Sequence, residues 1–253
     1  MNLFEKSAWV RREIFKFKTK SGNGHLASCL SCVDILVSMY YDEKTDFNYK
    51  TDEVIFGKGH GSPSVYPILV DFGMVDSKEF VKYTQPGGQL RLHADKSIPG
   101  CSFVGGSLGN GIGFAAGRAL ACDHDIYVIL GDAELYEGSV WESLIFIAHH
   151  KLHNIKIIID RNKLGILGDT EELLKLEPLK EKFESFGFSA LEVDGHNFDQ
   201  LQSALSHMKK KNSIIIANTI KGKGVSYMEG KWEYHTIIPK KEDEIKKGLE
   251  ELV

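Results

Sequence analysis

The amino-acid sequence predicts a doubly wound α/β protein with a mainly parallel sheet and helices on both of its faces. Short apolar runs alternate with stretches of helical periodicity along the 253 residues. Such runs are typical of strands that are buried on both faces, as in a parallel sheet. Their alternation with helices favours an α/β layer architecture. No repeat, low-complexity tract or linker divides the chain, so we expect one domain over residues 1–253.

Each predicted element rests on a pattern. Residues 1–20 predict an amphipathic helix, in which charges such as Glu5 and Arg11 interrupt the apolar positions and exclude a signal peptide. The strand candidates are Val54–Phe56, Ile126–Leu130, Ile155–Ile159, Leu191–Val193 and Ile214–Ala217. Helical periodicity occupies 26–41, 109–121, 138–152, 176–187 and 198–211. The basic run 209–211 suits a helix C-terminus, and a charged helix is expected at about 240–253.

The composition is that of an ordinary soluble globular protein, with 42% hydrophobic and 26% charged residues. A formal net charge of -4 gives no reason to expect binding to nucleic acid or to an anionic membrane. No apolar stretch approaches the roughly 20 residues that are needed to cross a bilayer. We therefore expect a cytoplasmic protein.

The four cysteines do not suggest a disulfide framework in a chain of this length. Cys29 and Cys32 have the spacing of a redox pair or of half a zinc site, but no second pair completes a tetrahedral set. Both lie in a helical apolar pattern, where small thiols pack well. We expect them to be buried packing residues.

Polar residues follow two successive strand candidates. The run Ile126–Leu130 leads into Gly131 and Asp132, and the run Ile155–Ile159 leads to Asn162. In a doubly wound sheet, ligands bind beyond the carboxyl ends of the strands, where the strand order reverses. Because one helix-length stretch separates the two runs, we expect their strands to be neighbours. The Asp and Asn side chains are then expected close together at such a site.

The chemistry of this pair favours one class of ligand. A carboxylate and an amide carbonyl oxygen are hard ligands that suit Mg²⁺ or Ca²⁺ better than zinc. Ca²⁺ usually takes roughly six to eight oxygens, whereas Mg²⁺ completes its shell with phosphate oxygens and water. The pair therefore suggests a Mg²⁺–diphosphate ligand. Asp and Asn are also common at turns and helix starts, so each residue taken alone fits a local structural role.

The surrounding residues resemble a known family. Gly131, Asp132 and Ala133, followed after a helix-length interval by Arg161 and Asn162, resemble the thiamine diphosphate motif, which usually reads Gly-Asp-Gly and later Asn-Asn. Within that superfamily, the chain resembles the amino-terminal half of transketolase over nearly its whole length. Further segments match in the family's order: Ser21–His25, Gly57–Gly61, Gly106–Gly111, and Lys221–Gly224 followed by His235.

The resemblance implies thiamine diphosphate and Mg²⁺ as cofactors. It implies that Mg²⁺ is held by the side chains of Asp132 and Asn162 and by the backbone carbonyl of Leu164. The residues that it assigns to cofactor binding are His60, Gly106, Ser107, Leu108, Gly131, Asp132, Ala133, Glu137, Asn162 and His235. Ala133 and Arg161 depart from the family's pattern, but neither change removes an expected metal ligand.

The resemblance also implies catalytic histidines, which bind cofactor phosphates and handle substrate hydroxyl protons: His25, His60, His93 and His235. A free pKa near 6.5 lets histidine give and take protons near neutrality, although a histidine beside glycine also fits a simple turn. The family usually has Gly-His-Pro at the third position, where this chain has Leu92 and Ala94 around the histidine. Other histidines are expected at a solvated helix end: His149, His150 and His153.

A partner is implied as well. Glu137 and Glu142 match acidic positions at the family's subunit contact, and they equally suit the start of a helix. The family's pyrimidine-binding domain, whose glutamate activates the cofactor, has no counterpart in these residues. We therefore expect the N-terminal subunit of a split transketolase, active only with a C-terminal subunit, in a heterotetramer with two copies of each. A truncated form of a longer chain has the same sequence.

The expected activity is that of a transferase that moves a two-carbon ketol unit between sugars or sugar phosphates. The chain also fits the corresponding part of a deoxyxylulose-phosphate synthase or of a 2-oxoacid dehydrogenase component. The changes at Ala133 and around His93 permit a non-catalytic cofactor-binding module. Dinucleotide binding is disfavoured, because the glycines at 109, 111 and 113 follow no clear strand. The sequence leaves the donor and acceptor sugars open.

Overall fold

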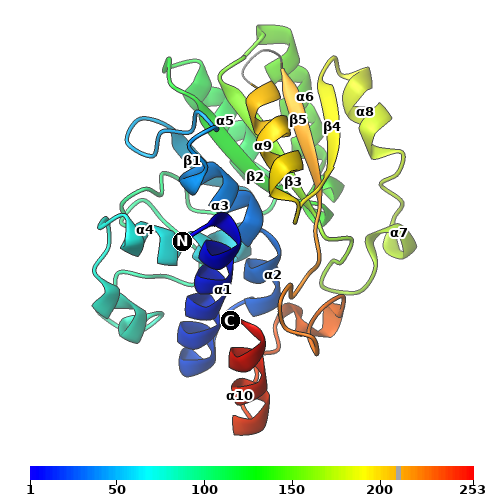
Figure 1. Ribbon diagram of the computed structural model, residues 1–253. Helices are drawn as coiled ribbons and strands as arrows, with labels where there is room; N and C mark the ends of the chain where they lie inside the picture. Colours follow the sequence, from blue (N-terminus) through cyan, green and yellow to red (C-terminus); the bar gives the residue numbers. More distant parts are fainter. Residues whose placement is uncertain (209–211) are drawn as a thin grey trace.

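The computed structural model describes residues 1–208 and 212–253; the basic run 209–211, predicted at a helix C-terminus, lies outside the described residues. The described residues form a five-stranded parallel sheet in the order β1-β2-β3-β5-β4 (Figure 1). The strands are β1 Glu53–Phe56, β2 Ile126–Gly131, β3 Ile155–Arg161, β4 Ser189–Asp194 and β5 Ser213–Asn218. The prediction of an α/β fold with a parallel sheet is confirmed.

Helices occupy most of the remaining chain. The α-helices are α1 Leu3–Ser21, α2 Leu26–Ser31, α3 Val33–Tyr41, α4 Tyr66–Asp71, α5 Asn110–Ala119, α6 Gly138–His150, α7 Thr170–Leu173, α8 Leu179–Ser185, α9 Phe198–His207 and α10 Glu242–Glu251. Short 3₁₀ helices are η1 Gly59–Val65, η2 Ser77–Lys82, η3 Ala133–Tyr136 and η4 Trp232–His235.

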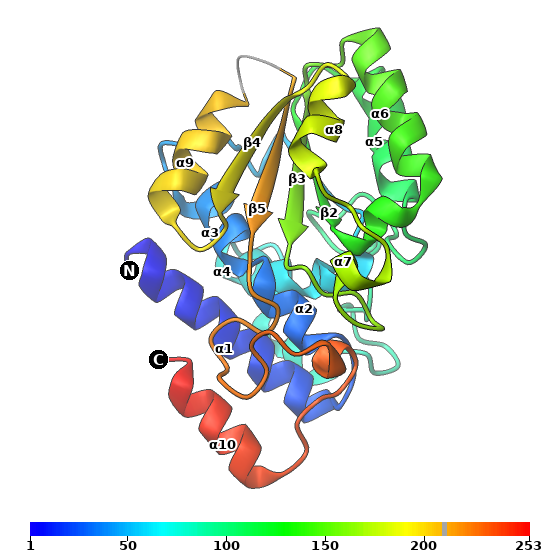
Figure 2. The ribbon, with the colours of Figure 1, turned by 90° about the vertical axis from the view of Figure 1, so that its right-hand side faces the viewer.

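Both faces of the sheet are covered, as predicted (Figure 2). On one face, Val128 and Ile159 join a buried cluster with side chains of α5, α6 and α8. On the other, Ile129 and Ile158 join a cluster with α1, α2, α3 and α9. Successive strand residues point to opposite faces, so each central strand contributes to both clusters. Burying each of these branched side chains stabilises the fold by roughly 1.5–3 kcal/mol. The buried strands hold their carboxyl ends, where the site lies, in fixed positions.

The strand order departs from one expectation. Strands β1, β2 and β3 are neighbours in chain order, after which the chain passes to β4 at the edge and returns to β5. The order therefore does not reverse between β2 and β3, and the prediction of a reversal there is wrong. The two strands are parallel neighbours as predicted, with Gly131 paired to Asp160. Their carboxyl ends consequently lie side by side.

Three predicted elements differ in detail. The helix predicted at 26–41 is interrupted at Cys32, where φ is -91° and ψ is 8°. The helix predicted at 176–187 begins only at Leu179, because Pro178 precedes it and disfavours the helical conformation at the residue before the proline. Strand β4 was predicted to be buried on both faces, but only Ala190 is buried and its other five residues are partly or fully exposed, because it is an edge strand.

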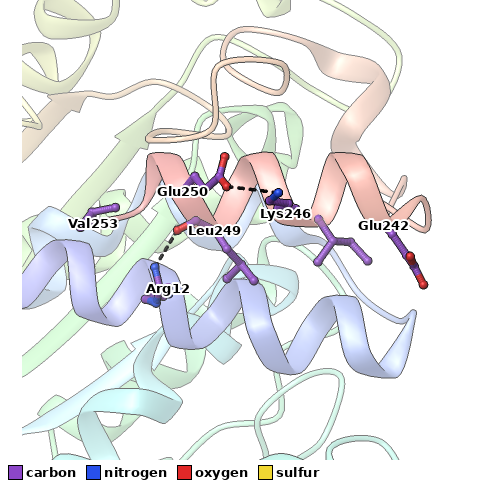
Figure 3. Close-up of a pocket in the computed structure, with 7 residues that line it drawn as sticks. Arg12, Glu242, Lys246, Leu249, Glu250 and Val253 are labelled. Atoms are coloured by element: carbon purple, nitrogen blue, oxygen red, sulfur yellow. Dashed lines mark hydrogen bonds and ion pairs between the residues drawn. The ribbon is translucent and has the colours of Figure 1, made fainter.

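The first and last helices pack together. Arg12 on α1 donates from Nη1 to the carbonyl oxygen of Leu249 on α10, 2.6 Å away (Figure 3). All four cysteines are free thiols, and Cys29 and Cys32 are buried as predicted. In the part of the chain that the structure describes, no helix is both long and apolar enough to cross a membrane.

Candidate functional site

Asp132 lies at the carboxyl end of β2 and is buried. Its Oδ2 accepts hydrogen bonds from Nη1 of Arg161, at 3.2 Å, and from the backbone N–H of Lys163, while Oδ1 accepts from the N–H of Ala133, at 2.8 Å. Burial raises the pKa of the Asp132 carboxyl, and the nearby Asp160 raises it further. The carboxylate is therefore held in place by donors from both strand ends.

The other two oxygens of the expected metal set lie in the segment that follows β3. The Asn162 Oδ1 accepts from the backbone N–H of Leu164, at 3.1 Å. The carbonyl oxygen of Leu164 accepts from Nζ of Lys221, at 2.9 Å, and Lys221 also donates to the carbonyl of Gly165, at 3.2 Å. A buried ammonium group thus contacts an oxygen that sequence analysis assigned to a metal. Burial lowers the pKa of Lys221 to about 8.

These donors fit a hard cation. A carboxylate, an amide and a backbone carbonyl from adjacent strand ends are oxygen ligands of the kind that Mg²⁺ takes. Among the described residues, no group of three His, Cys, Asp or Glu side chains is placed to hold a metal. The oxygen set at the strand ends contains one carboxylate, that of Asp132.

Ala133 replaces the family's glycine without backbone strain. It begins the 3₁₀ helix η3, a right-handed conformation that any L-residue adopts. Since the turn does not need a positive φ, the extra methyl group has no conformational cost here.

Glycines let two loops approach each other at the site. A Cβ atom on Gly59 would lie 1.5 Å from the carbonyl oxygen of Gly105, so the backbones of the two loops are in contact. Of the residues assigned to the cofactor in the second loop, Gly106 and Ser107 are exposed and Leu108 is half-buried.

Glu134 joins this loop to the sheet and was missed by sequence analysis. Its carboxylate accepts from the N–H of Gly109, at 2.9 Å, and from that of Gly131, at 3.2 Å. Burial raises the pKa of Glu134 to about 7. Its position two residues after Asp132 was the only sequence signal that it belongs to the site. The pattern of apolar residues predicts which apolar side chains are buried, and it does not show that an acidic one is.

The four histidines predicted to be catalytic meet in space. The ring centroid of His25 lies 5.3 Å from that of His60, 5.9 Å from that of His93 and 5.1 Å from that of His235. The rings of His60 and His235 are 5.2 Å apart. The four residues come from four separate segments, and we refer to them as the histidine cluster.

The histidine cluster is arranged for neutral imidazoles. Burial lowers the pKa of His25 to about 4 and that of His235 to about 3, and it also lowers the pKa values of His60 and His93. Lys18, Lys58 and Lys221 lower some of these values further. Buried Nδ1 of His25 has no hydrogen-bond partner among the described residues. An unpaired buried nitrogen of this kind fits a site that receives a polar ligand.

Lys221 connects the histidine cluster to the strand ends, since its Nζ lies 2.8 Å from Nδ1 of His235. A second buried lysine, Lys58, donates to Asp160 and to the carbonyl oxygen of Ser28, at 3.1 Å. Asp160 also accepts from Ser31 Oγ, at 2.6 Å, and from Thr219. Burial opposes ionisation of Asp160, but Lys58 and these donors hold its pKa below the ordinary value.

Lys18 is a third buried lysine that sequence analysis missed. Its Nζ donates to the hydroxyl of Tyr83, at 3.0 Å, and burial lowers its pKa. The signals available for Lys58 and Lys221 were their places inside segments that matched the family. Lys18 had no such signal, because a lysine in an amphipathic helix normally faces solvent.

Other predicted residues lie on the surface at α6. Glu137 occupies the N-cap position of α6 without a capping hydrogen bond from its side chain, and both Glu137 and Glu142 are exposed. Three histidines are exposed at or after the end of α6, as predicted: His149, His150 and His153.

A separate groove runs between α1 and α10 (Figure 3). It is lined by Arg12, Glu242, Ile245, Lys246, Leu249, Glu250 and Val253. Aliphatic side chains and an exposed pair, Lys246 and Glu250, make up much of this lining. The groove contains none of the histidine cluster, and its residues suit helix packing rather than chemistry.

Comparison with known proteins finds a family model and several proteins that are similar to this chain. Residues 14–252 match the family model described as transketolase, thiamine diphosphate binding domain. The chain is 36% identical over 264 residues to one subunit of the apulose-4-phosphate transketolase of Actinobacillus succinogenes, covering 99% of this chain and 95% of that protein. It is also 36% identical to one subunit of the 6-deoxy-6-sulfo-D-fructose transketolase of a Clostridium species, covering 86% of this chain and 84% of the relative.

Longer relatives match over part of their length. Human transketolase is 32% identical over 228 residues, which cover 86% of this chain and 37% of the human protein. The crystal structure of Campylobacter jejuni transketolase superposes with a TM-score of 0.89 at 30% identity, covering 100% of this chain and 43% of that one. The chain therefore spans about two fifths of these single-chain transketolases.

Proposed function

The chain belongs to the transketolase family through its thiamine diphosphate-binding domain, and we propose that it provides the cofactor-diphosphate site of a two-subunit transketolase. The observation that carries this proposal is the histidine cluster, which Lys221 links to the Leu164 carbonyl in the segment after β3. In this proposal, the cofactor site and the proton-handling site are adjacent. The whole chain is proposed to form one domain around them.

The strand-end oxygens are the proposed Mg²⁺ ligands: Asp132 and Asn162 through their side chains, and Leu164 through its carbonyl. The further residues proposed to contact the cofactor are His60, Gly106, Ser107, Leu108, Gly131, Ala133, Glu137 and His235. Their support is the oxygen chemistry of the strand ends and the exposed backbone of the glycine-rich loop. Since Lys221 Nζ contacts the Leu164 carbonyl, a cation bound at that oxygen would lie beside the ammonium group.

Thiamine diphosphate, when bound, supplies the stabilised carbanion chemistry that a protein side chain cannot provide. The protein's part is to hold the sugar and to move its hydroxyl protons. The proposed catalytic residues are His25, His60, His93 and His235. Because burial keeps their imidazoles neutral, each has one nitrogen that accepts a proton and one that donates a hydrogen bond.

A partner subunit is part of the proposal. Large apolar side chains on α5, on α6 and in the adjoining loops are 38% to 59% exposed: Val104, Phe114, Leu120, Ile145 and Phe146. Exposed apolar side chains grouped on two packed helices support a protein interface. We propose that this surface, together with Glu137 and Glu142, contacts a C-terminal pyrimidine-binding subunit in an assembly with two copies of each. The four free cysteines support a cytoplasmic location.

The proposed reaction is the transfer of a two-carbon ketol unit between sugars or sugar phosphates. Two relatives carry substrate names that describe anionic sugars, apulose 4-phosphate and 6-deoxy-6-sulfo-D-fructose, which supports a polar, charged substrate class. A non-catalytic cofactor-binding module is the competing function. The meeting of four histidines from separate segments favours catalysis over that alternative, because imidazoles can give and take substrate protons.

Cofactor binding is the first test of the proposal. We expect titration calorimetry of the chain, with its partner where needed, to show thiamine diphosphate binding in Mg²⁺ and none in excess EDTA. Equal binding with and without the metal would remove the proposed role of the strand-end oxygens. Metal-dependent binding without ketol transfer by the complete assembly would instead identify the non-catalytic module.

A further inference from the structure

We propose that Arg161 is a positioning residue that holds Asp132 and anchors the segment 163–177 beside it, and that it thereby sets the affinity for Mg²⁺ and thiamine diphosphate. The inference rests on the proposed function, because it concerns the same strand ends. It assigns a role to the residue that replaces the first Asn of the family's Asn-Asn pattern.

Arg161 makes hydrogen bonds to the end of β2 and to the segment that follows β3. Arg161 is the last residue of β3, and its side chain is 1% exposed. Nη1 donates to Asp132 Oδ2, at 3.2 Å, and to Thr170 Oγ1, at 2.7 Å. Nη2 donates to Glu171, at 2.6 Å, and to Glu177, at 3.1 Å. One guanidinium group therefore joins the end of β2 to the segment that follows β3.

Glu171 extends this connection into the backbone. Its carboxylate accepts from the N–H of Leu176, at 3.2 Å, and from that of Glu177, at 3.3 Å. Thr170 is fixed from the other side, because its N–H donates to the carbonyl of Lys163, at 2.9 Å. These hydrogen bonds close the segment 163–177 into a loop that is anchored to the side chain of Arg161.

Two of the proposed metal oxygens depend on this arrangement. Asp132 is bonded directly to Arg161, and the backbone N–H of Lys163 bonds to the same carboxylate oxygen. Leu164, whose carbonyl is the third proposed ligand, is the next residue of the anchored loop. Loss of the guanidinium group would therefore release the carboxylate and loosen the carbonyl together.

The geometry requires arginine rather than any cation. The two terminal nitrogens donate to acceptors on four residues, which the rigid fork of a guanidinium group can reach and a single ammonium group cannot. Lysine at this position would keep the charge and lose most of the contacts. Lysine is therefore the informative substitution, because it separates positioning from simple charge.

The chain provides a matched control for a buried arginine pair. Arg11 is also buried, and it bonds Asp34 through two nitrogens, at 2.9 Å and 2.7 Å. Neither residue contacts the strand ends of β2 and β3. Arg11→Lys therefore reports the general effect of losing a buried bidentate pair.

The test compares Arg161→Lys, Arg11→Lys and wild type by two readouts. Calorimetry gives the thiamine diphosphate Kd at fixed Mg²⁺, and hydrogen exchange of the full chain gives the protection of the segment 163–177. We expect Arg161→Lys to raise the Kd roughly 10–100-fold, the usual loss when a residue that orients a metal ligand is changed. Excess Mg²⁺ should recover part of the binding, and exchange in the segment should become faster. Arg11→Lys should do neither.

A wild-type Kd and unchanged protection in Arg161→Lys would overturn the inference, as would an equal loss in Arg11→Lys. If Arg161→Lys does not fold, Glu171→Gln takes its place, because Glu171 is partly exposed and leaves the bond to Asp132 intact. It should speed exchange in the segment, and unchanged exchange would count against the anchoring role. If wild type itself shows no metal-dependent binding, the proposed function fails, while hydrogen exchange still decides whether Arg161 anchors the loop.

Discussion

The Nζ atom of Lys221 lies 2.9 Å from the carbonyl oxygen of Leu164 and 2.8 Å from Nδ1 of His235. One buried ammonium group therefore contacts both an oxygen at the end of β3 and an imidazole of the histidine cluster. In the proposed function, the first belongs to the metal site and the second to the substrate site. In that proposal, Lys221 is the physical link between cofactor binding and proton transfer.

We predict that Asp132→Asn weakens Mg²⁺-dependent binding of thiamine diphosphate by at least about tenfold, because it removes a charged metal ligand while keeping the shape of the side chain. Asparagine is preferable to alanine, since Arg161 is buried against this side chain and needs an acceptor. Asp34→Asn, at the buried pair with Arg11, is the control. Calorimetry that finds the wild-type Kd in Asp132→Asn would remove this residue from the proposed metal site.

His25→Ala and His60→Ala should each lower ketol-transfer turnover by roughly 10²-fold, the range expected when a general acid–base group is lost. The assay uses the complete assembly with saturating cofactor, so that turnover rather than binding is compared. His149→Ala is the matched control, because that histidine is exposed at the end of α6. Wild-type turnover in both variants would show that the two histidines are structural turn residues and not catalytic ones.

The buried pair of Lys58 and Asp160 leads to a prediction about stability. Asp160→Asn should lower the free energy of unfolding by roughly 3–5 kcal/mol, because it leaves the buried Lys58 ammonium group without its charge partner. Arg118→Ala, which breaks a partly exposed pair with Glu53, should cost only about 0–1 kcal/mol. Urea denaturation measures both values. Equal losses in the two variants would contradict the importance assigned to burial.

Much of this arrangement was predictable from the sequence, and the exceptions share a cause. Apolar runs located the strands, and the order of glycine and histidine segments identified the residues of the histidine cluster. The pair of Lys58 and Asp160 was not predictable, because its members are separated by 102 positions and periodicity does not show which partner a charge meets. The exposure of β4 was missed for a related reason, since edge position depends on strand order.

Glu134 should make stability depend on pH. Its pKa is raised from 4.5 to about 7 by burial, so the folded state favours the protonated form. The corresponding stabilisation is fully present below pH 4.5 and is lost as the pH rises through about 7, with a total of about 3 kcal/mol. Glu134→Gln has no proton to lose and should not show this loss. Urea denaturation at about pH 5 and about pH 8 checks the difference, and the same change with pH in both proteins would contradict it.

The division of labour between two subunits is the central claim, and ketol transfer tests it most directly. The purified chain is assayed with Mg²⁺, thiamine diphosphate, a ketose phosphate donor and an aldose phosphate acceptor, with and without the C-terminal subunit. We predict no turnover by the chain alone and full turnover by the mixture, because the acid that activates the cofactor is expected on the partner. Full turnover by the chain alone would contradict the account.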